Sequence, residues 1–414
     1  MTEPRAANAG ASAGPLAGIR VLDLATMLAG PYAATLLGDL GADVIKVESH
    51  YGDESRHLGP ERDGQRSPFV SLNRNKRGLV LDLRRPAAQE VFARLVAKSD
   101  VLITNVREPA LSRLGLAYDQ VRRCRTDIIW AGVTAFGPDG PYAGRPGIDF
   151  LAQGYAGLLS LNGHPDGAPV RVTVPLVDVM TSELVVTGVL TALLVRVRTG
   201  EGQRIDVSLL DALVHAQASG LGAYFLTGEV TPRTGNRSQY FAPSGVYACA
   251  DGRGIVITCP SEKFFGNLCT ALAVEWKSDP RFATIEQRLA NQDALDGVLA
   301  ARCRDFDRDD LLARLIAADV LAAPIHEIPE VVRDPQVRHN QMIVPTQHTR
   351  LGAIEVTGVP VKLRGTPGSV RRSAPLQGEH TAEICAELGY GADDLEALMR
   401  DGAAATADRP RTHR

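Results

Sequence analysis

The sequence predicts an α/β protein with a doubly wound, Rossmann-like large domain and a smaller α+β domain. Three observations support this prediction. Short apolar stretches alternate with helical patterns in the first half of the chain, and this alternation is typical of a parallel sheet. The 40 glycines and 25 prolines cluster in short breaks between those stretches. At 414 residues, the chain is also longer than one hydrophobic core usually organises.

The first predicted unit begins with the apolar stretch 19–24, which is typical of a buried strand. Ala29-Gly30-Pro31 breaks the chain, and a helical pattern follows at 32–39 and ends at Gly41. The stretch 42–48 is a second strand. These elements form a compact strand–helix–strand unit, so a parallel, doubly wound sheet is expected.

The same alternation continues along the large domain. Further strands are predicted at 79–83, 100–104 and 127–133, with helices at 86–97 and 109–114. After a Gly/Pro-rich break at 137–141, the pattern predicts a long helix at 177–198, a strand at 205–209 and a helix at 209–226.

A link rich in Gly, Pro and Arg marks a domain boundary near 228–245. We expect the large domain over 16–227 and the small domain over 228–335. Strands 245–250 and 255–260, joined by Asp251-Gly252, and helices 262–274, 294–303 and 308–318 are predicted in the small domain. The Ala/Gly-rich ends, 1–15 and 401–414, are expected to be disordered tails.

Composition excludes several partners. The net charge of -3 gives no reason to expect nucleic acid or an anionic membrane surface. The longest apolar run, 184–197, is shorter than the roughly 20 residues that span a bilayer, so we expect a soluble protein with no membrane partner. The start lacks the apolar core of a signal peptide. The six cysteines form no CxxC pair and no metal-ligand spacing, which favours the cytoplasm and predicts no metal site.

Two features could carry chemistry. Asp178 follows Pro175 at the start of the long helix, where a carboxylate is favoured by the helix dipole, and the residues alone favour that structural role. The same position would also suit a nucleophilic carboxylate. The basic cluster 73–77 and the pair Arg84-Arg85 flank one predicted strand. They are typical of solvated surface, or could converge on a phosphate-rich ligand such as coenzyme A.

Several motifs, in order along the chain, resemble the CaiB/BaiF family of class III CoA-transferases. They are GIRVLDLATMLAGPYAATLLGDLGADVIKVE, LNRNKRGLVLDL, DVLITNVREPALSRLGL, GPYAGRPGIDFLAQGYAGLL, GEGQRIDVSLLDA and LQGEHTAEICAELGY. The likeness covers residues 16–390 and includes the formyl-CoA transferases and the related α-methylacyl-CoA racemases. It implies an interlaced homodimer in which residues 336–400 return to the large domain.

The resemblance also implies the chemistry. Asp178 would be the covalent nucleophile that takes coenzyme A from an acyl-CoA donor and passes it to a carboxylic acid, with no permanently bound cofactor. The implied lining of the coenzyme site is Leu28, Ala29, Leu81, Asp82, Leu83, Arg84, Asn105, Val106, Arg113, Arg145 or its neighbour Pro146, and Asp149 beside the nucleophile.

Departures from the family narrow the reaction. The racemases carry a histidine in a GHD motif, whereas this chain has Gly147-Ile148-Asp149, so two-base racemisation loses one base. This favours transfer over a 2-methylacyl-CoA racemase or epimerase, which stays the alternative. No glycine-rich flap is found, which argues against formyl-CoA/oxalate chemistry. No dinucleotide fingerprint supports a nicotinamide-dependent oxidoreductase.

The acceptor acid is not specified by the motifs. Arg233 and Arg237 are candidates for selecting the acceptor, and short dicarboxylates such as succinate are expected by analogy.

Overall fold

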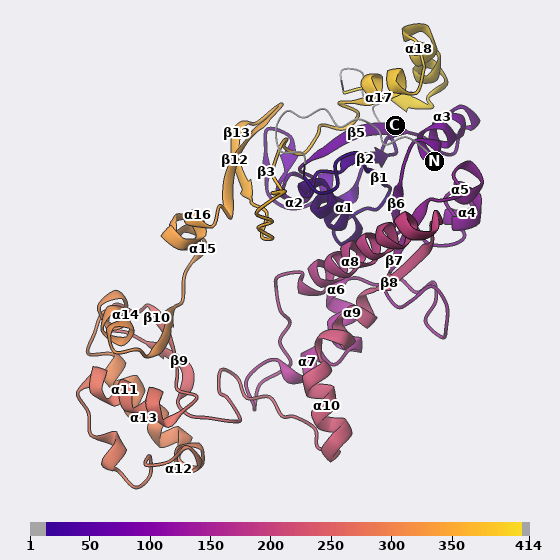
Figure 1. The fold of residues 1–414 in the computed structure, drawn as a ribbon. Coiled ribbons are helices and arrows are strands. Elements are labelled where there is room, and N and C mark those ends of the chain that lie inside the picture. The colour runs from indigo at the N-terminus through magenta and orange to yellow at the C-terminus, as the bar shows by residue number, and fades with distance from the viewer. Residues whose placement is uncertain (1–13, 408–414) are drawn as a thin grey trace. The chain divides into compact units, whose positions relative to one another are not determined.

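The computed structural model describes residues 14–407, so the expected tails at 1–13 and 408–414 lie outside the described residues. The chain forms two compact units (Figure 1). The first contains the residues up to Ala156, Val172–Leu221 and those from Pro335 onward; the second contains Gly157–Arg171 and Gly222–Asp334. The short stretch Gly157–Arg171, expected in the large domain, thus groups with the second unit, and the division at 221/222 precedes the expected 227/228.

The first unit is built on a seven-stranded sheet with the order β14-β5-β2-β1-β6-β7-β8. Its parallel strands are β1 (Arg20–Asp23), β2 (Asp43–Glu48), β5 (Lys76–Leu81), β6 (Val101–Thr104), β7 (Ile129–Thr134) and β8 (Arg204–Ser208). Strand β14 (Ala404–Ala405) pairs antiparallel with β5. Numbered along the chain, the parallel strands follow the order 3-2-1-4-5-6, which reverses between β1 and β6. The expected α/β architecture with a large, mostly parallel sheet is confirmed.

Helices cover both faces of this sheet (Figure 1). Leu22 and Ile45 belong to a core with α3 (Pro86–Ala97), α5 (Tyr118–Cys124) and α17 (Thr381–Glu387). Successive strand residues point to opposite faces. Val44 accordingly faces the other side, where its side chain lies against Gly38 of helix α1 (Ala29–Asp39).

Helix α8 (Leu176–Thr199) packs against α1, β7 and β8. It is long and apolar enough to cross a membrane by length and composition, and it is longer than the apolar run 184–197 noted in the sequence. Val185, Val189 and Leu193 are buried in the unit. These contacts fit a core helix of a globular fold.

The expected C-terminal tail is wrong for residues 401–407. Helix α18 (Ala392–Asp401) ends at Gly402, and the three alanines that follow are buried. Ala404 pairs with Leu81 and Ala405 with Val80. The segment that the composition marked as low in complexity is therefore an edge strand, because small apolar side chains fit under α17 and α18.

The basic cluster 73–77 is also structural. Arg74 and Lys76 are fully buried, and each holds a buried carboxylate: Arg74 pairs with Asp39 at 2.6 Å, and Lys76 with Asp23 at 2.7 Å. Strand β5 begins at Lys76, three residues before the predicted start, so the cluster lies at its amino end. A ligand of this fold binds at the carboxyl ends of the strands, so the cluster is not placed to bind its phosphates.

The second unit is a small α+β body. An antiparallel sheet of β9 (Ser244–Ala248), β10 (Gly254–Thr258) and β11 (Leu321–Pro324) packs with α11 (Glu262–Leu272), α13 (Gln292–Cys303) and α14 (Arg308–Ala317). Strand β11 was not expected. The helix predicted at 209–226 forms two helices, α9 (Leu209–Ala216) in the first unit and α10 (Ala218–Thr227), whose residues divide between the two units at 221/222.

Shorter elements complete the two units. They are β3 (Glu61–Arg62), β4 (Gln65–Arg66), α2 (Ser67–Leu72), α4 (Ala110–Arg113), α6 (Asp149–Tyr155), α7 (Leu158–Leu161), α12 (Ile285–Ala290), α15 (Ile328–Arg333), α16 (Pro335–His339), β12 (Ile343–His348) and β13 (Gly352–Thr357).

Candidate functional site

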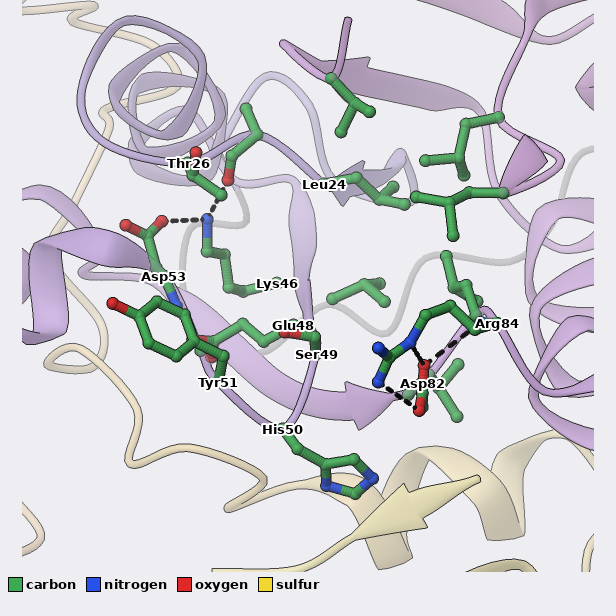
Figure 2. A pocket seen from close by; sticks show the side chains of 18 of the residues that line it. Leu24, Thr26, Lys46, Glu48, Ser49, His50, Tyr51, Asp53, Asp82 and Arg84 are labelled. Carbon is green, nitrogen blue, oxygen red and sulfur yellow. Dashed lines mark hydrogen bonds and ion pairs between the residues drawn. The ribbon is translucent and has the colours of Figure 1, made fainter. Parts of the chain in front are cut away.

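A pocket of about 380 Å³ opens at the carboxyl edge of the sheet (Figure 2). It lies at the switch point between β1 and β6, where this strand order places its ligand. It is lined by the carboxyl ends of β2 and β5, by the segments that follow β1, β2, β5 and β6, and by two leucines after α4: Leu24–Thr26, Lys46–Glu54, Leu81–Arg84, Val106, Leu114 and Leu116.

The turn after β1 is held tightly at this edge. The Asn105 side chain accepts a hydrogen bond from the Thr26 amide at 3.0 Å and donates to the Thr26 carbonyl at 2.9 Å. The Asp53 carboxylate accepts from the Met27 amide at 3.1 Å. Met27 has φ 71°, a left-handed conformation that is uncommon for a non-glycine residue. These side-chain bonds hold the turn in a conformation that the backbone alone does not favour.

A buried cluster of two lysines and two aspartates lies beneath the turn. The Lys46 Nζ lies 2.7 Å from Asp53 and 3.4 Å from Asp23, and the Lys76 Nζ lies 2.7 Å from Asp23. All four side chains have no exposed surface. Burial alone would raise the pKa of Asp53, but the Lys46 ammonium and Ser55 hydrogen bonds lower it to about 2. The cluster balances its charges and supports the turn from below.

Five of the residues implied by the resemblance line this pocket: Leu81, Asp82, Leu83, Arg84 and Val106. The Arg84 guanidinium is largely exposed and binds the Asp82 carboxylate at 2.7 and 2.9 Å, as Figure 2 shows. A ligand phosphate would therefore meet a cation that is already oriented by its partner.

The other implied coenzyme-site residues lie outside the pocket lining. Leu28 and Ala29 end the turn and begin α1, and Asn105 fixes the turn from β6. Arg113 is exposed in α4, next to the lining residue Leu114. Arg145, with Pro146 beside it, and Asp149 follow β7 instead.

The segment after β2 forms much of the pocket wall, although none of its residues was expected at the coenzyme site. In this segment the His50 Nε2 lies 2.9 Å from the Gly402 carbonyl, whereas its Nδ1 is buried without a partner among the described residues. The sequence did contain a signal for the position of this segment. The segment follows a predicted parallel strand, and such strands end at one edge of the sheet.

Asp178 lies in the first turn of α8, and Asp149 caps that turn. One Asp149 oxygen accepts hydrogen bonds from the Val177 amide at 2.8 Å and the Asp178 amide at 3.3 Å. The other oxygen accepts from Gln153 at 2.6 Å. Asp149 thus satisfies amides that a helix start leaves unpaired. The structure brings together the two carboxylates that the resemblance placed side by side.

Burial, together with a smaller effect of the nearby Asp149 charge, raises the pKa of the Asp178 carboxyl to about 7. Like charges and low polarity both disfavour the ionised form. A carboxylate with a raised pKa is a stronger base, and hence a stronger nucleophile once it is ionised. The helix-start position alone does not account for this shift, because a helix dipole stabilises the charged form.

The pKa of Asp178 predicts a pH dependence. In the nucleophilic role that the resemblance implies, only the ionised carboxylate of Asp178 could attack, so the transfer rate should fall about tenfold for each pH unit below about 7 and level off above it. Asp149→Asn removes a neighbouring negative charge and should shift this limb to lower pH. The measurement is the pH profile of kcat/KM with an acyl-CoA, and a flat profile down to pH about 5 would contradict this assignment.

Arg145 lies over a group of aromatic rings near this helix start. Its guanidinium carbon lies 4.3 Å from the centre of the Tyr142 ring. The rings of Phe136, Tyr142 and Tyr155 pack edge to face at 4.8 to 5.9 Å. Ile148, next to Asp149, is 61% exposed and offers no titratable group for proton transfer. The loop after β7 therefore supplies one oriented cation and no second base at position 148.

The arginines considered for acceptor selection lie in the second unit and have partners there. Arg237 pairs with Asp293 at 2.7 Å and Asp296 at 2.8 Å. Arg233 donates to the carbonyls of His164 and Gly167. Their role in acceptor selection stays a prediction. Within residues 14–407, no group of three or more His, Cys, Asp or Glu side chains could hold a metal ion.

Comparisons with known proteins agree over nearly the whole chain. The model of the family described as CoA-transferase family III matches residues 16–381. The succinate–glutarate CoA-transferase of Agrobacterium fabrum is 35% identical over 383 residues, covering 90% of this chain and 96% of that protein. The succinyl-CoA–D-citramalate CoA-transferase of Chloroflexus aurantiacus is 34% identical, covering 93% and 97%. A crystal structure of a CAIB/BAIF family protein from Brucella suis has a TM-score of 0.85 at 37% identity, covering 91% and 99%.

Proposed function

The chain belongs to CoA-transferase family III and transfers coenzyme A between an acyl-CoA and a carboxylic acid, and we propose that it does so through a covalent intermediate on Asp178. The family expected from the sequence motifs is thereby confirmed. The observation that carries the proposed intermediate is the half-buried Asp178 carboxylate, whose pKa is raised to about 7 at a capped helix start. Incubation with acyl-CoA followed by mass spectrometry tests it, because hydroxylamine-sensitive coenzyme A should appear on Asp178.

The proposed steps are acyl exchanges. The Asp178 oxygen attacks the thioester carbonyl, the C–S bond breaks, and an aspartyl–acyl anhydride and a CoA thiolate form. The thiolate attacks the aspartyl carbonyl and releases the donor acid, which leaves an aspartyl-CoA thioester. The acceptor carboxylate then attacks that thioester and expels the CoA thiolate, which leaves an aspartyl–acceptor anhydride. The thiolate attacks the acceptor carbonyl of this anhydride, forms the new acyl-CoA and frees the Asp178 carboxylate. Positioning of the reactants is worth up to about 7–11 kcal/mol in favourable cases.

The pocket at the switch point is proposed to hold the nucleotide end of coenzyme A. Its size suits part of a large ligand, and Arg84 at its rim offers a cation to a phosphate. Arg84→Gln should raise the KM for acyl-CoA by about tenfold, more at low salt, and leave kcat unchanged. Steady-state kinetics at two salt concentrations measure this. Arg94→Gln, on an exposed face of α3 and paired with Glu90, is the control. Equal KM changes in both variants would contradict the assignment.

The acceptor is proposed to be a short dicarboxylate. Two relatives that match this chain are named for succinate or succinyl-CoA together with glutarate or citramalate. The exchange assay with succinyl-CoA and a panel of mono- and dicarboxylates tests this directly. A 2-methylacyl-CoA racemase lacks support, because Ile148 cannot act as a base.

We also propose that the protein acts as an interlaced homodimer in the cytoplasm. Apolar side chains at the ends of α8 and α10 are strongly exposed in the single chain: Val197 is 84% exposed, Phe225 78% and Leu226 86%. Such groups are commonly covered by a partner. Light scattering should give about twice the chain mass of 44.3 kDa; a monomer at micromolar concentration would contradict it. The six free cysteines suit a reducing compartment.

A further inference from the structure

A buried hydroxyl joins the two halves of this site. The Ser182 side chain has no exposed surface and lies on α8, one turn after Asp178. Its Oγ lies 2.7 Å from the Ala29 carbonyl, at the start of α1, and 2.9 Å from the Asp178 carbonyl. The hydroxyl has a single proton to donate, so the two carbonyls share it. The same group thus contacts the turn of the coenzyme pocket and the residue proposed as nucleophile.

The backbone on both sides of this hydroxyl is held by other contacts. On one side, Ala29 directly follows the turn that Asn105 and Asp53 fix against the sheet. Gly30 lies so close to β1 that a Cβ there would come within 2.3 Å of the Ala25 Cβ, so α1 begins directly against the strand end. On the other side, Asp149 caps the first turn of α8. Among the described residues, Ser182 is the side chain that hydrogen-bonds both the start of α1 and Asp178.

We propose that Ser182 is a positioning residue that sets the Asp178 carboxylate relative to the turn of the coenzyme pocket. The inference rests on the proposed nucleophilic role of Asp178. The turn and the pocket would fix the position of a bound thioester, whereas α8 fixes the position of the Asp178 carboxylate. A misplacement of about 1 Å between such groups can cost about a hundredfold in rate. The buried hydrogen bond from Ser182 on α8 to Ala29 on α1 resists such a displacement of one helix relative to the other, and Ser182 does so without contacting the substrate.

The neighbouring residue provides a matched control. Thr181 is equally buried, and its hydroxyl donates to the Val177 carbonyl at 2.8 Å within α8. It therefore makes the same kind of bond one residue earlier, and among the described residues its hydroxyl makes no hydrogen bond to α1. Thr181→Val removes this bond while it keeps the shape of the side chain, so it reports the cost of losing a buried hydroxyl from this turn.

The test measures the single-turnover rate of coenzyme A loading on Asp178, together with the dissociation constant for coenzyme A. Ser182→Ala should lower the loading rate about tenfold or more and leave the dissociation constant within twofold. Ser182→Thr, which keeps the hydroxyl, should recover most of the rate, and Thr181→Val should load at the wild-type rate. If Ser182→Ala does not fold, Ser182→Cys, which keeps the volume but is a weak donor, carries the same expectation.

Each contrary outcome has a distinct meaning. A wild-type loading rate in Ser182→Ala, or an equal loss of rate in Thr181→Val, overturns the positioning role of Ser182. A rate loss accompanied by an equal loss of coenzyme A affinity overturns it as well, because it would indicate a damaged pocket. If the wild-type protein exchanges coenzyme A but never carries it on Asp178, the proposed function fails instead.

Discussion

Replacing Asp178 with asparagine is expected to lower the rate of coenzyme A transfer by at least about a thousandfold, since an amide of the same shape cannot form the anhydride. The fold should survive. Asp178 is a carboxylate whose pKa is raised by burial and by Asp149, so its ionised form destabilises the folded state. The variant is therefore expected to unfold at a similar or slightly higher temperature than the wild type at pH 8.

The sign of that stability effect follows from proton binding. Between the ordinary carboxyl pKa and about 7, the folded protein binds more protons at Asp178 than the unfolded chain does. The contribution of Asp178 to the free energy of unfolding therefore falls as the pH rises through that window. Transfer assays and thermal melts measure both effects, with Glu201→Gln, an exposed residue just after the same helix, as the control. Substantial turnover by Asp178→Asn would rule out the covalent mechanism.

The second large effect is expected in stability. Asp23→Ala should lower the free energy of unfolding by about 3–5 kcal/mol, because it leaves Lys76 buried without its carboxylate and removes one neighbour of Lys46. Burial already lowers the pKa of Lys76 to about 8 even with Asp23 present. Without Asp23, the ammonium either loses its proton or lets water into the core, and the turn above it loses support.

A more exposed carboxylate on the same strands is the comparison. Asp43 pairs with Arg20 and Arg77, but its side chain is 36% exposed, and the buried Arg77 also pairs with Glu383 and Glu387. Asp43→Ala leaves no cation without a partner, so it should cost less, about 1 kcal/mol. Urea unfolding of both variants measures the difference. A larger loss in Asp43→Ala than in Asp23→Ala would show that the buried cluster does not stabilise this edge of the sheet.

Most of the large sheet could be predicted from local patterns. The strand at 42–48 and the helix at 86–97 match β2 and α3 closely, because apolar periodicity and Gly or Pro breaks are local signals. Two predictions of solvent-exposed segments were wrong for the same reason. The three alanines at 403–405 and the basic cluster 73–77 look solvated by composition, but both are buried by partners far along the chain. No local signal reports such pairing.

The site divides in the same way. The sequence by itself determined the family and singled out Asp178 as the expected nucleophile, because ordered motifs can be compared without coordinates. It also determined that position 148 holds no base. The resemblance also placed Asp149 beside Asp178. Only the tertiary structure decided the contacts made there: the hydrogen bonds by which Asp149 caps α8, the burial that raises the Asp178 pKa, and the Ser182 hydroxyl between the Asp178 and Ala29 carbonyls. A raised pKa and a hydrogen bond between helices depend on groups brought together by folding, so they have no expression in the order of residues alone.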